Sequence, residues 1–181
     1  MFFANSNKYS ILTISHNWRN VNIKILNFDQ ATKITGYSLF DNKELVTYGK
    51  LEVDKKEKNI IERMKQMISL IKLKIDEHKP DFIVFEDCQF QKSYKTYQEL
   101  SQMQGVLMNL LFDLNIGFEI VSPSTWRSYS KIKGRKRIEQ KLNTQIFVKD
   151  KYGIEVSEDI ADAIALGVFS SNKVKSKVLA G

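Results

Sequence analysis

Four acidic residues stand where their side chains could share divalent metal ions. Asp29 and Glu86 each close a short apolar run, "NIKILNF" and "DFIVF", and Asp159 and Asp162 open the apolar segment "EDIADAIALGV". Carboxylate oxygens are the ligands that Mg²⁺ and Mn²⁺ prefer. Two such ions can activate a water molecule and stabilise the leaving oxygen of a phosphodiester. The chemistry indicated is two-metal hydrolysis.

Each of these acids also has an ordinary structural interpretation when taken singly. An acid after a strand is commonly a turn residue or a helix cap, and acids in a helix's first turn interact favourably with the helix dipole. Asp159 and Asp162 are three residues apart, which puts them on one face of a helix. Four carboxylates gathered at one point would repel strongly without cations. The combination therefore favours a metal site.

The positive charge of the chain is concentrated in one segment. Residues 126–151 contain nine Lys or Arg against Glu139 and Asp150, which accounts for the whole net charge of +7. Such a concentration is typical of a phosphate-binding surface, although a solvated helix face gives similar counts. Because the aromatic residues Trp126 and Tyr129 stand at the start of the segment, we interpret it as a nucleic-acid-binding surface.

Apolar periodicity predicts the elements that must position these residues. Short apolar or alternating runs predict strands, and apolar residues at helical spacing predict helices, with Pro80 after the end of the first helix and Pro123 after the last strand. The predicted strands are 22–28, 34–40, 44–53, 81–86 and 118–122, and the predicted helices are about 58–78, 94–114, 134–150 and 157–170.

The order of these elements predicts an α/β fold with a mixed five-stranded sheet, three antiparallel strands followed by two parallel ones, flanked by helices. The strands ending at Asp29 and Glu86 would be parallel neighbours, and open sheets place ligands at that edge. Residues 1–21 show no clear periodicity. We expect an N-terminal extension there, as a flexible tail, an extra edge strand or the product of an upstream start codon, and a single domain over residues 22–181.

Composition limits where the protein works. The single cysteine, Cys88, cannot form an intrachain disulfide, which is typical of a reducing compartment. No apolar run approaches the roughly 20 residues that a membrane helix needs, and the N-terminus lacks the pattern of a signal peptide. We expect a cytoplasmic protein without a membrane partner.

Five segments resemble RuvC-type Holliday junction resolvases of the ribonuclease H-like superfamily. They are "ILNFDQATKITGYSLF", "DFIVFEDCQF", "YQELSQMQGVLMNLL", "VSPSTWRSYSKIKGRKRIEQ" and "EDIADAIALG", and they cover roughly residues 22–170. The lysine- and isoleucine-rich form is similar to the resolvases carried by lactococcal bacteriophages. The resemblance implies a ribonuclease H-like fold and, for a phage protein, activity inside the bacterial host cell.

The resemblance further implies a crossover junction endodeoxyribonuclease that acts on branched DNA as a homodimer, in recombination or in resolving replicated phage DNA. By position, Asp29, Glu86, Asp159 and Asp162 would be the catalytic residues and the ligands of two Mg²⁺ ions, for which Mn²⁺ would substitute. No small-molecule cofactor is implied. Because family members pack helices symmetrically, the helix around Gly105 would lie in the dimer interface, where this glycine permits a close approach.

The resemblance also assigns DNA contacts. Phe90 lies close to an aromatic position that stacks on bases at the crossover in the family, although ordinary packing is the alternative. Base stacking on an aromatic side chain contributes about 1–3 kcal/mol. The basic positions that match the family's DNA-binding lysines follow the fifth strand, with Arg127 the clearest match; they are Arg127, Lys131, Lys133, Arg135, Lys136 and Arg137.

One departure from the family and three rival functions stay open. Gln30, Ala31 and Thr32 stand where the family usually carries Pro-Gly-Ser, so selectivity among four-way junctions, three-way junctions and forks is undecided, and cleavage of all three is a hypothesis. The first rival is an actin-like sugar kinase, although this chain lacks the glycines of a phosphate loop and the length for two lobes. The second is a catalytically silent branched-DNA-binding protein. The third is a ribonuclease H-like nuclease acting on RNA:DNA hybrids.

Overall fold

The two apolar runs that end in acids form neighbouring central strands. In the computed structural model, which describes residues 22–90 and 93–180, β1 (Lys24–Asp29) pairs in parallel with β4 (Phe82–Glu86). Both interiors are fully buried, which is why these strands read as continuous apolar runs. The sheet order is β3-β2-β1-β4-β5, with β2 (Ile34–Asp41), β3 (Glu44–Glu52) and β5 (Gly117–Val121) completing it.

The antiparallel half of the sheet is a hairpin joined to β1. β2 pairs antiparallel with β1 and with β3, whereas β5 pairs in parallel with β4. The hairpin turn is made by Asn42 and Lys43, which both have positive φ, 48° and 81°. Two left-handed residues match the right-handed twist of the flanking strands. The predicted mixed five-stranded α/β fold is confirmed.

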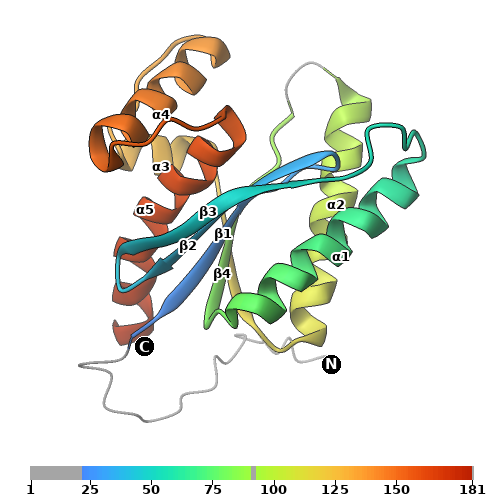
Figure 1. Cartoon of the computed structure of the whole chain (residues 1–181), viewed down its shortest axis with the longest axis horizontal. Helices are drawn as coiled ribbons and strands as arrows, with labels where there is room; N and C mark the ends of the chain where they lie inside the picture. The colour runs from blue at the N-terminus through green and yellow to red at the C-terminus, as the bar shows by residue number, and fades with distance from the viewer. Residues whose placement is uncertain (1–21, 91–92, 181) are drawn as a thin grey trace, which may run out of the picture.

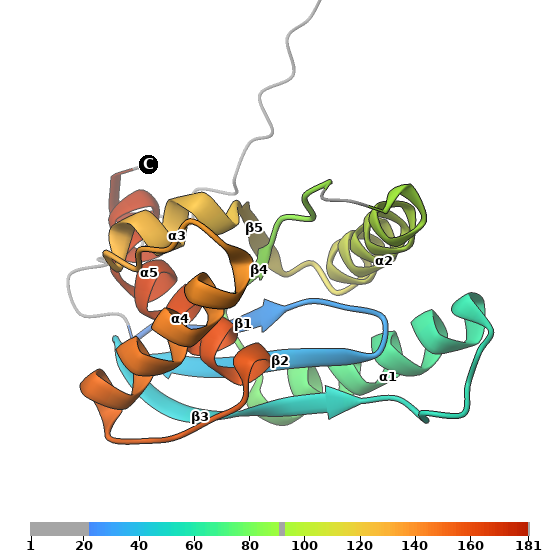
Figure 2. The same cartoon turned by 90° about the horizontal axis from the view of Figure 1, so that it is seen from above.

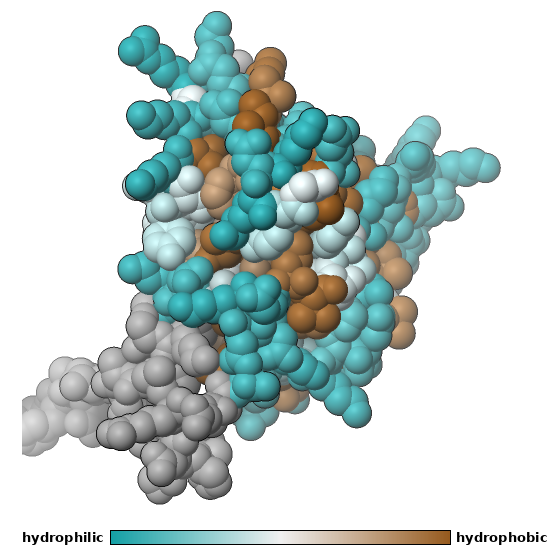
Figure 3. Space-filling view, turned by 60° about the vertical axis from the view of Figure 1, so that its left-hand side comes forward, coloured by the Kyte–Doolittle hydropathy of each residue, from teal (hydrophilic) through white to brown (hydrophobic). Residues whose placement is uncertain are grey.

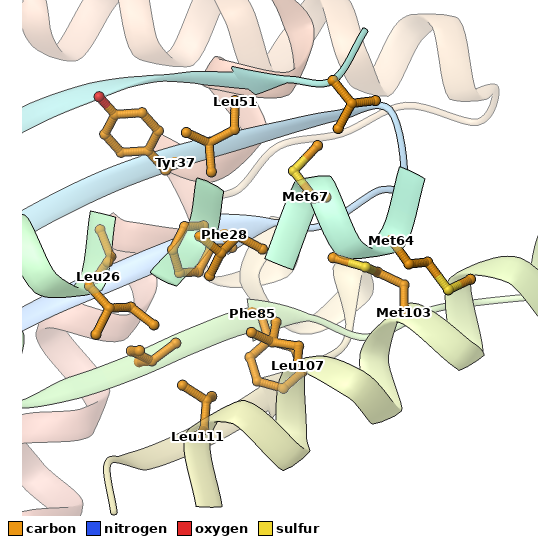
Figure 4. Packing of buried hydrophobic residues seen from close by; sticks show 14 of the residues in the cluster. Leu26, Phe28, Tyr37, Leu51, Met64, Met67, Phe85, Met103, Leu107 and Leu111 are labelled. Carbon is orange, nitrogen blue, oxygen red and sulfur yellow. The ribbon is translucent and has the colours of Figure 1, made fainter. Parts of the chain in front are cut away.

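One face of the sheet is covered by α1 (Ile60–His78) and α2 (Tyr94–Asp113), as Figure 1 and Figure 2 show. Each helix presents an apolar stripe at helical spacing to the strands. Figure 4 shows this cluster, in which α1 and α2 pack on side chains of β1, β2 and β4. The helical members that are most buried are Met64, Met67, Ile71, Ile75, Met103, Leu107 and Leu111.

The other face is covered by α5 (Glu158–Ala180), which packs directly on β1 and β2, with α3 (Pro123–Tyr129) and α4 (Arg137–Tyr152) beside it (Figure 2). Every residue from 161 to 171 is buried. Ser38 donates a hydrogen bond to the carbonyl of Ala163 (2.7 Å), and Ser170 donates one to Asn27 (2.5 Å). These polar contacts hold α5 in one register on the sheet.

Several predicted boundaries were wrong. The basic helix begins at Arg137 rather than near 134, because Gly134 has φ 153° and breaks the helical path. The last helix continues to Ala180 rather than ending near 170. α3 was not predicted, although Ser122 caps it by accepting a hydrogen bond from the N–H of Thr125.

The expected N-terminal extension, residues 1–21, lies outside the described residues. Among the helices that the structure describes, none is long and apolar enough to cross a membrane.

Candidate active site

A cleft of about 640 Å³ opens at the edge of the sheet where β1 and β4 end, and all four predicted acids line it. In the parallel pairing of β1 and β4, Phe28 lies opposite Phe85, so Asp29 and Glu86 occupy the next position on each strand. The expectation that these strands are parallel neighbours is confirmed. The cleft wall is completed by residues of α2, α3, α4 and α5.

The start of α5 reaches the cleft because one strand residue has no side chain. Gly36 on β2 pairs with Asp29, and a Cβ placed on Gly36 would lie 1.9 Å from the carbonyl oxygen of Asp159. The backbone of α5 therefore lies directly against β2 beside the end of β1. A glycine inside a strand often marks such an approach, and this signal was present in the sequence but was not used.

The electrostatics of Asp29 show how closely the acids gather. Burial raises the pKa of Asp29 well above its ordinary value, and the negative charges of Glu86, Asp162 and Asp159 raise it further. Lys141 opposes these effects. Because one carboxylate is affected by three others from β4 and α5, the four form one electrostatic group.

The pKa values of Glu86 and Asp162 are raised for the same main reason. Burial raises the pKa of Glu86 to about 7 and raises that of Asp162, while the guanidinium of Arg127 lowers both. Lys141 also lowers the pKa of Asp162 and forms an ion pair of 2.6 Å with Glu158. The carboxylates are thus only partly neutralised by the cations around them.

The short helix α3 supplies direct contacts to Glu86. Trp126 donates a hydrogen bond from Nε1 to Oε2 of Glu86 (2.7 Å). An Nη of Arg127 lies 3.9 Å from the same oxygen and 3.8 Å from Oδ2 of Asp162. Trp126 is fully buried, so the interpretation of this residue as part of a nucleic-acid-binding surface is wrong. Its contact with Glu86 spans 40 residues and had no signal in the local sequence.

The residues present fit a hard divalent cation. The donor set consists of carboxylates, and Oδ1 of Asp162, whose side chain is 5% exposed, has no hydrogen-bond partner. Within residues 22–90 and 93–180, however, no three acidic, histidine or cysteine side chains already converge on one point as a ligand set. The acids share a cleft, and Arg127 contacts two of them there.

The predicted DNA-binding residues divide into two groups. Arg127 and Arg137 line the cleft. The other four lie outside its lining, are exposed and precede α4; they are Lys131, Lys133, Arg135 and Lys136. On the face shown in Figure 3, hydrophilic side chains project around the upper part of the molecule, where Figure 1 places α4.

Phe90 is 61% exposed near the opposite wall of the cleft and makes an edge contact with Tyr97, with ring centroids 5.8 Å apart. Because Tyr97 lines the cleft, Phe90 lies at its border. Phe90 is therefore not a core residue, although it packs against Tyr97.

The raised carboxyl pKa values predict that the metal-free protein loses stability as the pH rises. A carboxyl with a higher pKa in the folded state than in the unfolded state holds its proton more tightly when folded. Its contribution to stability is present below the unfolded pKa and is lost as the pH rises through the folded pKa, which for Glu86 is about 7. Between about pH 5 and pH 8, we expect the free energy of unfolding in EDTA to fall by on the order of 2–3 kcal/mol.

Chemical denaturation at a series of pH values measures this fall. Glu86→Gln is the matched variant, because it keeps the shape of the side chain without a titrating group, and it should make the profile flatter. A free energy of unfolding that is constant or rises over this range would contradict the prediction.

Comparisons with known proteins agree with the sequence-based resemblance. Residues 21–170 match the protein family described as "Lactococcus phage M3 protein". The chain is 26% identical over 167 residues to the crossover junction endodeoxyribonuclease RuvC of Fusobacterium nucleatum, covering 88% of this chain and 85% of that protein. The resemblance to RuvC-type resolvases, in a form similar to that of lactococcal phages, is confirmed.

Solved structures show the same fold. Thermus thermophilus RuvC in complex with a Holliday junction substrate matches with a TM-score of 0.67 at 12% identity, over 86% of this chain and 97% of that one. The fowlpox virus resolvase in complex with Holliday junction DNA matches with a TM-score of 0.56 at 17% identity, over 84% and 99% of the two chains. At these identities the likeness establishes the fold alone.

Proposed function

Because the chain belongs to the family described as Lactococcus phage M3 protein, and because it resembles RuvC in sequence and fold, we propose that it is a metal-dependent endonuclease that hydrolyses phosphodiesters in branched DNA. The proposed domain comprises residues 22–181. The substrates would be Holliday junctions, three-way junctions and forks, in recombination or resolution of replicated phage DNA inside the bacterial host cell. No small-molecule cofactor is required.

The observation that carries this proposal is the gathering of four acids from three elements in one cleft. The acids raise one another's pKa values, and this mutual repulsion destabilises the metal-free fold. Strongly raised carboxyl pKa values in a cleft are typical of functional sites. A DNA-binding protein without catalysis would have no use for this repulsion, because uncompensated carboxylates repel phosphate.

The site would use its own residues in three ways. Asp29, Glu86, Asp159 and Asp162 would hold two Mg²⁺ ions, or Mn²⁺ in their place. When bound, the ions would supply an activated water molecule and stabilise the leaving oxygen. Trp126 holds one oxygen of Glu86 by a hydrogen bond, which leaves the other carboxylate oxygen available as a ligand.

The substrate would be held mainly through its phosphates. The exposed residues Lys131, Lys133, Arg135 and Lys136 would contact the DNA backbone outside the cleft, and Arg127 and Arg137 would contact it within. Phe90 would stack on a base exposed at the branch point, which the interior of a continuous duplex does not offer. Selectivity for branched DNA would thus depend on an aromatic residue beside the cleft.

One cleavage assay tests the proposal. Synthetic four-way, three-way, forked and linear DNA and an RNA:DNA hybrid are incubated with the protein in Mg²⁺, in Mn²⁺ and in EDTA. We expect incision of branched DNA with either ion and none in EDTA. Binding of junctions without incision in any metal would favour the non-catalytic alternative, and preferential cutting of the hybrid would favour the other nuclease class.

We also propose a homodimer formed through the exposed face of α2. A Cβ on Gly105 would meet nothing within 4 Å, so no described part of this chain makes the close approach expected there. On the exposed side of α2, Phe112 is 64% exposed one helical repeat from Gly105, and Val106 beside Gly105 is 44% exposed. A helix with a glycine beside exposed apolar residues can pack closely on a symmetric copy of itself.

Val106→Lys is expected to convert the dimer to a monomer, because a charge buried in an apolar interface is costly to desolvate. Light scattering coupled to size exclusion measures the change, and Leu73→Lys on the exposed face of α1 is the control for an added charge. A wild-type protein that is monomeric at all accessible concentrations would contradict the proposal.

A further inference from the structure

Arg127 lies within 4 Å of two carboxylates that come from different elements. One of its Nη atoms is 3.9 Å from Oε2 of Glu86 on β4 and 3.8 Å from Oδ2 of Asp162 on α5. Both distances are longer than a hydrogen bond. The guanidinium therefore acts on the two acids as a shared positive charge rather than as a bidentate partner of either one.

The rest of the side chain is held by α3 without a strong directional bond. The guanidinium stacks on the ring of Trp126 at 4.4 Å, and Nε of Arg127 is buried without a hydrogen-bond partner. A buried unpaired donor costs free energy. Oδ1 of Asp162 is likewise buried and unpaired. A buried donor on Arg127 and a buried acceptor on Asp162 are thus both unpaired at the same contact. Movement of Arg127 would therefore break no hydrogen bond between its guanidinium and Glu86 or Asp162.

These observations indicate that Arg127 and a divalent cation would compete for the same two carboxylates, Glu86 and Asp162. Glu86 and Asp162, if they held a divalent cation, would direct toward it the negative charge that Arg127 now partly neutralises. We propose that Arg127 is a tethered counter-ion, which neutralises Glu86 and Asp162 in the metal-free site and is displaced when a divalent cation binds. The inference rests on the proposed metal-dependent function and assigns Arg127 a role in the absence of DNA.

Displacement would also couple the metal to the substrate. Arg127 lines the cleft, so once displaced it is available to a phosphate of the DNA. Coupling between two ligands is reciprocal. A phosphate that binds Arg127 would favour metal binding, and metal binding would release Arg127 for the phosphate.

Titration of the protein with Mn²⁺ alone, without DNA, tests the proposal. We expect Arg127→Gln to bind Mn²⁺ about tenfold more tightly, or more, because the competing charge is gone. Arg135→Gln, which removes the same charge from an exposed position outside the cleft lining, should leave the affinity unchanged. The wild type should also show a higher unfolding midpoint in EDTA than Arg127→Gln, with the difference reduced at saturating Mn²⁺.

Each other outcome has one meaning. An unchanged or weaker Mn²⁺ affinity in Arg127→Gln overturns the counter-ion proposal and leaves metal binding intact. Equal tightening in both variants also overturns it, because a general charge effect would then suffice. Absence of saturable Mn²⁺ binding by the wild type overturns the proposed function, and the inference with it.

A measurement on the wild type does not depend on the folding of a variant. The ¹⁵Nε–¹Hε signal of Arg127 is followed by NMR during titration with Mg²⁺. We expect this signal to shift in proportion to the occupancy reported by the side-chain carboxyl signal of Asp162. An Arg127 signal that stays in place while that of Asp162 shifts would show that the guanidinium is not displaced.

Discussion

Asp29→Asn is expected to reduce the rate of branched-DNA cleavage by about 10³-fold or more, because metal activation of a phosphodiester supplies several kcal/mol of transition-state stabilisation. Asp29 is affected by the three other acids of the proposed ligand set, so its loss disrupts the whole set. Asp162→Asn should have a similar effect. Gel-based cleavage of a four-way junction in Mg²⁺ measures both rates, and junction binding, measured by fluorescence anisotropy in EDTA, should survive.

The same change should stabilise the metal-free protein. Burial and three like charges raise the pKa of Asp29, which means that its ionised form is disfavoured in the folded state. An amide of the same shape removes this cost, so the unfolding midpoint of Asp29→Asn in EDTA at pH 8 should exceed that of the wild type. Asp76→Asn, which alters an exposed carboxylate on α1, should change neither activity nor stability appreciably. A variant that retains cleavage would remove Asp29 from the proposed site.

Gly36→Ala is expected to destabilise the fold by about 1–3 kcal/mol or more, since the added methyl group overpacks a filled site. The new Cβ would lie 1.9 Å from the carbonyl oxygen and 2.4 Å from the carbonyl carbon of Asp159. These are backbone atoms, which cannot rotate away as a side chain can. The first turn of α5 must therefore move off β2, and Asp159 and Asp162 move with it.

Cleavage should fall further than stability alone explains. A displacement of about 1 Å in a catalytic group can cost 10²-fold in rate. Gly117→Ala on the edge strand β5 is the matched control, because its Cβ would meet only the ring of Phe82, at 3.0 Å, and that side chain can shift. Thermal unfolding and cleavage rate are measured for both variants. If Gly36→Ala folds and cuts like the wild type, α5 does not depend on this contact.

Both predictions concern the same tension between function and stability. The acids that would hold metal raise one another's pKa values, and the cations nearby lower them only in part. The acids stay close together despite their repulsion because rigid elements hold them. The paired strands β1 and β4 fix Asp29 and Glu86, and the buried interior of α5 fixes Asp162. Binding of a divalent cation would then stabilise the protein by relieving the repulsion.

The amino-acid sequence by itself determined the strands, the mixed sheet and the residues that end β1 and β4. It could do so because burial imposes local periodicity, and because the chain direction of each element fixes which residue reaches the sheet edge. The charge of residues 126–151 also marked the basic surface, since charge density along the chain needs no knowledge of packing. The start of the last helix at Glu158 followed from the same local signals.

Only the tertiary structure decided how the site is assembled. Gly36 and Asp159 are 123 positions apart, and their contact depends on how closely α5 lies on β2. Trp126 stands at the start of the segment interpreted as a nucleic-acid-binding surface, yet packing buries it and directs its N–H to Glu86. Arg127 has two acids within 4 Å only because α3, β4 and α5 meet at one point. Contacts of this kind are set by the joint packing of distant segments. A local pattern can indicate that Gly36 is closely approached, but it does not identify the residue that approaches it.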